Sequence, residues 1–394
     1  MILINTLYRK EKFPLKWRRK SIMNYTFWVV VCMSMFYKIN VNALTMDKPA
    51  VVLVKPVYNL NPKDADTTIT LQQTYVVSTD DNLVVDFSVP VKLTVIESKT
   101  QVVEVRLSLT GKSIKANAEQ KAKTLKLSAS KEELSGYVKT GELLLAIPAT
   151  LKSQFTLQEG QILFNATDAK LQLQLQRGDV KLLNAKGNYT ISVNQGSITC
   201  QKSQIQGSLK ASSGLTQIIQ SKGHFLATTG SGFFTVNSPS QDVNASIQKG
   251  QMDLKVAEGN VFAQIRDGNF SFEWQGKEKV QAQQFDIRAI NSIVLLNFPV
   301  GFSMDLNLDQ NQTHELLAST DTTAVPTLKR KGKKMKLESE FALTKPTEKE
   351  IIHRGKKMKI AQSHQLINGG ANKVSIHSTD SEVYFKKLKG SSKN

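Results

Sequence analysis

Gly250-Gln-Met-Asp-Leu-Lys-Val256 and Gly259-Asn-Val-Phe-Ala-Gln-Ile265 contain, one after the other, the unit that decides the fold of this 394-residue chain. Each unit begins with glycine and then places an apolar side chain at every second residue, the alternation of a β-strand with one buried face. The two glycines are nine residues apart, and ten glycines fall on one nine-residue lattice of thirteen nodes between residues 160 and 268. These corner glycines are Gly160, Gly178, Gly187, Gly196, Gly214, Gly223, Gly232, Gly250, Gly259 and Gly268. A fixed period of this kind indicates a repeat protein.

The odd length of the repeat predicts a bend at each glycine. A continuous strand would point its apolar side chains to the opposite face after nine residues. The fourth residue after each node is nevertheless apolar in all thirteen units, so the same phase returns every time. Glycine accepts positive φ angles and suits such a corner. We predict an all-β, repetitive β-solenoid with about nine residues per strand and corner, and therefore eighteen residues in a two-strand coil. An antiparallel meander fits the local pattern as well.

Composition divides the chain into five segments. Basic residues at 16–20 precede an apolar run at 27–37 and the small-residue site at 41–43, which is the three-part pattern of a secretory signal peptide. We expect export to the periplasm, the outer surface or the medium, with an uncleaved N-terminal membrane anchor as the alternative. The predicted segments are a signal peptide at 1–43, a linker at 44–68, an irregular β portion at 69–139, a β-solenoid repeat domain at 140–310 and a basic, partly disordered tail at 311–394.

The net charge of +19 is concentrated at the two ends of the chain. Residues 44–323 carry 27 basic and 26 acidic side chains, so the body is nearly neutral and no nucleic acid is expected as a partner. The basic tail is expected to be a solvated spacer. Contact of this tail with an anionic membrane or polymer is the alternative.

Three parts of the chain together resemble a known family. They are the irregular β lead-in at 84–135, the strand Glu142-Leu-Leu-Leu-Ala-Ile-Pro148, and the Gly-x-Φ-x-Φ-x-Φ units from Gly160 to Gly268, where Φ is an apolar residue. This layout resembles the bacterial "putative adhesin" β-solenoid domain family over roughly residues 80–290. The resemblance implies a β-solenoid fold and brings no catalytic residues to transfer. Gly-Asp corners are common in that family, and here only Gly178-Asp179 has one.

The residue types needed for metal, redox or hydrolytic chemistry do not recur at suitable spacings. Calcium-binding β-rolls need paired glycines and an aspartate in each unit, which this repeat lacks. Four of the five histidines fall in the polar C-terminal part without zinc-ligand spacing. Cys200 occupies an inward position and is expected to be a buried, unreactive side chain. We therefore expect no cofactor, no metal ion and no enzymatic activity.

Most outward positions of the repeat are polar, and a few apolar residues depart from this rule: Leu215, Ile219, Leu226, Phe233 and Phe262. Leu215 and Phe233 are eighteen residues apart, so a two-strand coil would stack them on one sheet. We take Leu215, Ile219 and Phe233 as a candidate partner-binding patch, because exposed apolar patches mark interaction sites. The alternative is that another segment of the chain covers them.

These observations favour an exported, non-enzymatic protein of the bacterial cell envelope with an adhesin-like binding or scaffold role. Its partner would be an unidentified protein or envelope component. One alternative is a periplasmic carrier of lipid or another amphiphile, or an envelope-assembly factor. A less favoured alternative is a glycan-active enzyme, for which the outward-facing Asp253 and Glu273 are the candidate carboxylates.

Overall fold

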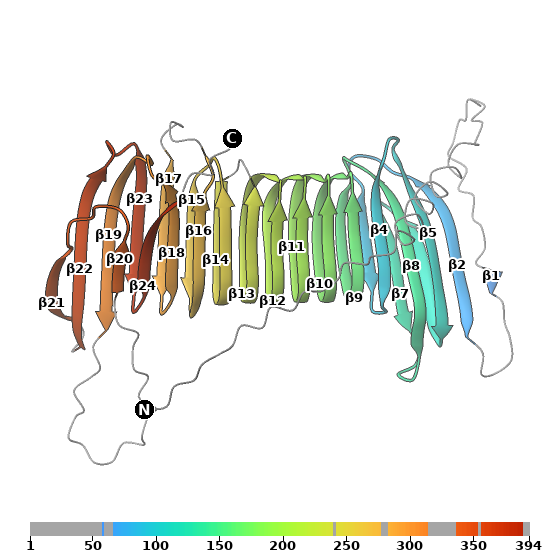
Figure 1. Cartoon of the computed structure of the whole chain (residues 1–394). Coiled ribbons are helices and arrows are strands. Elements are labelled where there is room, and N and C mark those ends of the chain that lie inside the picture. Colours follow the sequence, from blue (N-terminus) through green and yellow to red (C-terminus); the bar gives the residue numbers. More distant parts are fainter. Residues whose placement is uncertain are drawn as a thin grey trace, which may run out of the picture. The chain divides into compact units, whose positions relative to one another are not determined.

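The structure is a computed structural model that describes residues 57–58, 66–238, 242–276, 283–313, 336–353 and 356–388. The chain separates into residues 1–50 and a second unit, Val51–Asn394, to which all described residues belong. The predicted signal peptide lies outside the described residues. Every regular element described is a β-strand, and the twenty-four strands are hydrogen-bonded into one sheet (Figure 1). The described part of the chain contains no helix that is long and apolar enough to cross a membrane.

The centre of the fold is a parallel stack of eighteen-residue coils. Leu173 pairs with Ile191, and Ile191 pairs with Leu209, so each strand lies beside the residues one coil further along the chain. This parallel pairing confirms the predicted solenoid and excludes the meander for these residues. The long strands of the stack are β9 (Lys152–Asn165), β10 (Asp168–Leu183), β11 (Lys186–Gln201), β12 (Gln204–Ile219), β13 (Lys222–Ser238) and β14 (Asp242–Val256).

The next two coils continue the stack with shorter strands. β15 and β16 pair with β14 at the same offset of eighteen residues, whereas β17 and β18 follow at an offset of twenty-four. The extra residues fall between β16 and β17 in the sequence, and the pairing of the strands stays parallel. The bounds of these strands are Val261–Arg266 for β15, Gly268–Trp274 for β16, Gln284–Ile290 for β17 and Ile293–Pro299 for β18.

Each long strand bends once, at a corner glycine, and its parallel pairing skips one residue pair there and resumes in the same register, as from Leu175–Val193 to Arg177–Gln195. In β10 the side chains of Leu173 and Leu175 are buried before the bend, and those of Val180 and Leu182 after it. The phase changes at Gly178, whose φ is +131°. A Cβ atom at Gly178 would lie 1.8 Å from the carbonyl oxygen of Gly160 in the preceding coil. The backbones of neighbouring coils therefore touch at this column, and only glycine fits there.

The nine-residue lattice consists of two different corners. One is the bend just described, where the glycines from Gly160 to Gly268 stack at every second node. The other closes each coil: three residues before the lattice node, φ is +52° at Asn184 and +50° at Lys202, and the node itself is a glycine of positive φ only in alternate coils, as at Gly187 (+108°). A buried small residue follows the left-handed one. Ser203 accepts a hydrogen bond at Oγ from the Ala185 amide (3.0 Å) and donates one to the Gln201 carbonyl (2.9 Å).

The two halves of each coil face each other across a filled core. Phe155 and Phe164 lie on opposite sides of the bend in β9, and their ring centroids are 6.0 Å apart. All thirteen residues at the fourth position after a lattice node are at most 1% exposed, as the sequence predicted. Cys200 is one of them, and burial raises the pKa of its thiol. Its Sγ donates to Ser221 Oγ at 3.5 Å.

The N-terminal β portion is a coil capped by antiparallel strands. β3 and β4 form the coil that pairs in parallel with the two halves of β9. β7 and β8 form the next coil outward, beside β3 and β4. β5, β2 and β1 then continue from β8 in antiparallel order, and β6 pairs with β7. Their bounds are Val57–Tyr58 (β1), Thr67–Val76 (β2), Asn82–Phe87 (β3), Val91–Ser98 (β4), Val102–Lys112 (β5), Ile114–Lys121 (β6), Thr124–Lys131 (β7) and Tyr137–Pro148 (β8).

The C-terminal end repeats this plan. β23 and β24, the last strands of the chain, lie between the coil of β17 and β18 and the strands β19 and β20, which come earlier in the sequence. β22 and β21 close the end in antiparallel order. The described residues beyond 335 thus extend the sheet, which differs from the predicted separate basic tail. The bounds are Met304–Thr313 (β19), Lys336–Ser339 (β20), Thr347–His353 (β21), Lys356–Ile367 (β22), Asn372–Thr379 (β23) and Glu382–Leu388 (β24).

Replacing a bend glycine in the middle of the stack is expected to destabilise the whole solenoid. In Gly214→Ala the new Cβ would lie 1.9 Å from the Gly196 carbonyl oxygen, at a φ of +131°. We expect a loss of about 3 kcal/mol or more in the free energy of unfolding, measured by denaturant titration. Ser212→Ala, an exposed change in the same strand, is the control and should unfold like the wild type. Equal midpoints for the two variants would contradict this account of the bend.

The buried Tyr189 should make the free energy of unfolding decrease as the pH rises into the alkaline range. Burial raises the pKa of its phenol to about 12, and the hydroxyl lies 3.0 Å from Thr167 Oγ1. Folding favours the neutral phenol, so this stabilisation is present below the ordinary pKa of about 10 and is lost as pH rises to 12. Denaturant unfolding at pH 8, 10 and 11 should show a steeper loss in the wild type than in Tyr189→Phe. Parallel losses in both proteins would contradict it.

Candidate functional site

The structure brings Leu215 and Phe233 together on the outer face of the second half of the coils. The two residues are direct partners in the parallel pairing of β12 with β13. Phe233 is 55% exposed, and Leu215 and Ile219 are half-buried, so no described segment covers the phenylalanine. Ile219 lies four residues further along β12 and pairs with Asn237 instead. The centre of the candidate patch is therefore the Leu215–Phe233 pair.

The other two outward apolar residues, Leu226 and Phe262, lie on the first half of the coils. Leu226 and Phe262 each pair with Asn244, one coil away on either side. Leu226 is 47% exposed. The Arg288 guanidinium lies 5.1 Å from the centre of the Phe262 ring. The five outward apolar residues thus form two separate surfaces.

A polar hollow of about 460 Å³ adjoins the Phe233 ring. The hollow exists because Gly250 and Gly268 continue the bend column beside Phe233 and carry no side chains. On its far side Asn291 Nδ2 donates a hydrogen bond to Asp267 Oδ1 at 2.6 Å. An exposed aromatic ring beside a hollow with amide and carboxylate groups can hold a partner's side chain and orient it by hydrogen bonds.

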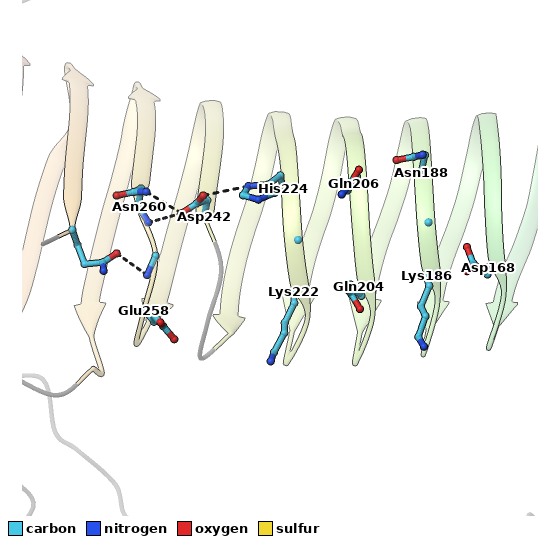
Figure 2. Close-up of a pocket in the computed structure, with 14 residues that line it drawn as sticks. Asp168, Lys186, Asn188, Gln204, Gln206, Lys222, His224, Asp242, Glu258 and Asn260 are labelled. Carbon is cyan, nitrogen blue, oxygen red and sulfur yellow. Dashed lines mark hydrogen bonds and ion pairs between the residues drawn. The ribbon is translucent and has the colours of Figure 1, made fainter. Parts of the chain in front are cut away.

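A polar groove of about 830 Å³ lies on the first half of the coils, next to the coil-closing corner (Figure 2). Two rows of side chains border it, one on each side of the lattice positions. The first row consists of Asp168, Lys186, Gln204, Lys222 and Glu258, and the second of Asn188, Gln206, His224, Asp242 and Asn260. Successive members are neighbours in the parallel pairing of β10 to β13. The groove, defined by these two rows, therefore runs along the solenoid axis.

One end of the groove is held by a chain of hydrogen bonds. Asp242 Oδ2 lies 3.2 Å from His224 Nδ1. Asp242 Oδ1 accepts a hydrogen bond from the backbone amide of Asn260 at 2.8 Å. Asn260 Oδ1 in turn accepts from the backbone amide of Gln284 at 3.0 Å. These contacts tie four successive coils together and fix the orientation of the side chains.

The middle of the groove has polar groups that remain available. The side-chain amides of Asn188, Gln204 and Gln206 are exposed and form no hydrogen bond within the described residues. Each amide offers two donor hydrogens and an acceptor oxygen. Sequence reasoning missed this groove. Its signal was the polar residue on each side of alternate lattice glycines, as in Lys186-Gly187-Asn188 and Lys222-Gly223-His224.

The carboxylates weighed for glycan cleavage are engaged by their own neighbours. Asp253 Oδ2 accepts from Gln251 Nε2 at 2.7 Å. Glu273 lies 3.4 Å from Lys255 Nζ and accepts from Gln275 Nε2 at 3.0 Å. These contacts give both carboxylates a role on the sheet surface.

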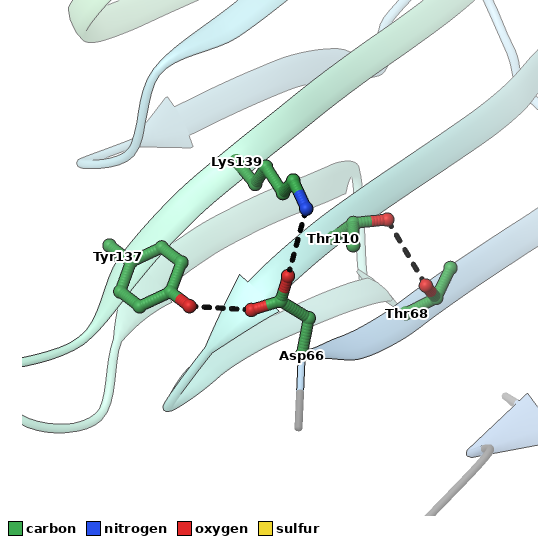
Figure 3. A network of polar contacts seen from close by, with 5 residues as sticks. All are labelled: Asp66, Thr68, Thr110, Tyr137 and Lys139. Atoms are coloured by element: carbon green, nitrogen blue, oxygen red, sulfur yellow. Dashed lines mark hydrogen bonds and ion pairs between the residues drawn. The ribbon is translucent and has the colours of Figure 1, made fainter. Parts of the chain in front are cut away.

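A second polar cluster lies at the start of the described body and has a structural role (Figure 3). Asp66 accepts a hydrogen bond from the Tyr137 hydroxyl at 2.6 Å and lies 3.5 Å from Lys139 Nζ. The hydrogen bond from Tyr137, with the nearby Lys139, lowers the pKa of Asp66. Thr68 and Thr110 join their hydroxyls across β2 and β5 at 3.1 Å. The cluster fastens the beginning of β2 to the antiparallel pair of β5 and β8.

Three of the solved structures to which this chain is similar share little sequence with it. A putative cell adhesion protein from Clostridium sporogenes is 7% identical, with 81% of this chain and all of the other covered and a TM-score of 0.20. Putative adhesins from Parabacteroides merdae and Parabacteroides distasonis are 12% and 10% identical. They cover 60% and 58% of this chain and 90% of their own, with TM-scores of 0.34 and 0.28. No protein-family model matches the chain, and no curated protein matches its sequence.

Proposed function

We propose that this chain is an exported, non-enzymatic binding protein of the cell envelope with an adhesin-like role, and that it binds a partner protein through the Leu215–Phe233 patch. The observation that carries the proposal is the pairing of an exposed phenylalanine with a half-buried leucine on a face that is mostly polar. Burying an exposed phenylalanine in a partner contributes favourable free energy in proportion to its apolar area. Large aromatic side chains also provide most of the binding energy in many interfaces.

The parallel stack supports this role by holding the patch rigidly. Leu215 lies one residue after Gly214 and Phe233 one residue after Gly232, at bends where the backbones of neighbouring coils touch. The side chains therefore lose little backbone freedom when they bind. A scaffold that presents a preformed aromatic surface suits adhesion better than catalysis.

The filled interior favours surface binding over the carrier alternative. Large side chains such as Phe234, Phe272 and Trp274 are at most 1% exposed between the two layers. An amphiphile would need an apolar cavity of several hundred Å³. The depressions described above lie on the outside of the coils and are lined largely by polar groups.

The double variant Leu215→Ser/Phe233→Ser tests the patch. We expect its affinity for the partner to fall by about thirtyfold or more, measured by biolayer interferometry against the cell-envelope fraction that retains the wild-type chain. The unfolding midpoint should change little, because both side chains are partly exposed. Val76→Ser, at a residue 54% exposed on β2, is the matched control and should bind like the wild type. Undiminished binding by the double variant would remove this site from the proposal.

Protease accessibility tests the location. If the solenoid is on the outer surface, protease added to intact cells should degrade the chain as completely as in cells with a permeabilised outer membrane. Immunoblotting of the body gives the readout, with a known periplasmic protein as the control for membrane integrity. Protection in intact cells would count against an adhesin and in favour of a periplasmic carrier or assembly factor.

A further inference from the structure

We propose that the polar groove is a second binding site, and that it takes a linear, uncharged glycan whose chain runs along the solenoid axis. This site is distinct from the Leu215–Phe233 patch. The groove lies on the first half of the coils and the patch on the second half. The two sites can therefore succeed or fail independently.

The spacing of the groove residues suits a chain of repeating units. Side chains of one row in neighbouring coils are separated by the distance between hydrogen-bonded strands, about 4.8 Å. One sugar ring in an extended glycan advances by a similar distance, so successive sugars can meet equivalent positions in successive coils. From Asp168 to Glu258 the groove spans five coil intervals, about 24 Å. That length accommodates about five sugars.

The width of the groove suits one sugar ring. The two rows are two residues apart along each strand, about 7 Å. Lattice glycines Gly187, Gly223 and Gly259 lie between them on alternate coils and also line the groove. The lattice residues without glycine, such as Ile205, turn their side chains into the core, so the floor between the rows is backbone, and a sugar ring can lie on it while its hydroxyl groups reach the row on either side.

The chemistry of the lining favours hydroxyl groups over charged groups. The free amides of Asn188, Gln204 and Gln206 combine donors and acceptors, as paired hydroxyls on neighbouring sugar carbons require. The two rows carry the lysines Lys186 and Lys222 against three carboxylates, so there is no excess of positive charge to attract a polyanion. Nucleic acid and acidic glycans are accordingly disfavoured.

A hollow with outward apolar side chains among its polar ones adjoins the C-terminal part of the groove. A neighbouring hollow of about 560 Å³ shares His224, Asp242 and Asn260 with the groove and adds Leu226 and Phe262. The C–H face of a sugar ring can pack against such apolar side chains while its hydroxyls bond to the adjacent polar groups. Polar rows that adjoin outward apolar side chains are what a glycan needs and a free ion does not.

The test is calorimetric titration of the full chain with neutral linear hexasaccharides: β-1,4-linked glucose, mannose and N-acetylglucosamine, and α-1,4-linked glucose. We expect at least one to bind with a dissociation constant below about 1 mM, and its affinity to rise from the disaccharide to about the pentasaccharide. The variant Gln204→Ala/Gln206→Ala should weaken binding about tenfold or more. Gln172→Ala/Gln174→Ala, which removes two exposed glutamines from the same face outside the groove, should bind like the wild type.

Three results would overturn the proposal. The first is the absence of binding by all four hexasaccharides. The second is binding that the Gln204/Gln206 variant and its control change equally. The third is binding of polygalacturonate alone, lost in Lys186→Ala/Lys222→Ala, which would make the ligand an anionic polymer. The Leu215→Ser/Phe233→Ser variant should retain full glycan affinity, so failure of the patch and failure of the groove are separately visible.

Discussion

The close approach of backbones in neighbouring coils is the constraint on which the rest of the structure depends. Parallel pairing places each bend directly on the bend before it, and at Gly196 a Cβ atom would lie 1.8 Å from the Gly178 carbonyl oxygen. A side chain at any one bend would force two coils apart and break the ladder on both layers. Glycine at every second lattice node is therefore a condition for stacking. The core, the outer faces and the groove all follow from that stacking.

The ends of the stack face a different problem. A parallel sheet that simply stopped would expose two strand edges, which invite pairing with other chains. Both ends have the same arrangement. The outermost parallel coils are covered by antiparallel strands, and strands from later in the sequence lie between strands from earlier in it. The outermost C-terminal strand, β21, also carries Glu348, Lys349 and Glu350, and charged residues discourage further pairing. The ends therefore close the fold and limit its growth.

How much could be predicted from the sequence differs between these parts. The coil was predictable because its two signals are local and repeated: glycine fills ten of the thirteen lattice nodes, and the fourth residue after the node is apolar in all thirteen units. The exact place of the coil-closing corner was not, because the left-handed residues Asn184 and Lys202 are not glycines and lie three residues before the lattice node. The placement of β23 and β24 depends on pairing with residues 89 positions earlier. No local pattern encodes a contact at that separation.

The candidate sites divide in the same way. Leu215 and Phe233 could be placed together from sequence, because eighteen residues is one coil and their phase is outward. The groove could not, because its members are ordinary polar residues whose significance comes from alignment across six coils. In a solenoid, residues at the same position of successive coils lie side by side and form a row along the axis, as Lys186, Gln204 and Lys222 do. Binding surfaces on such a fold are therefore best sought by comparing residues that are eighteen positions apart in the sequence. The side chains of such a row together determine which ligand can bind, whereas a short contiguous motif does not.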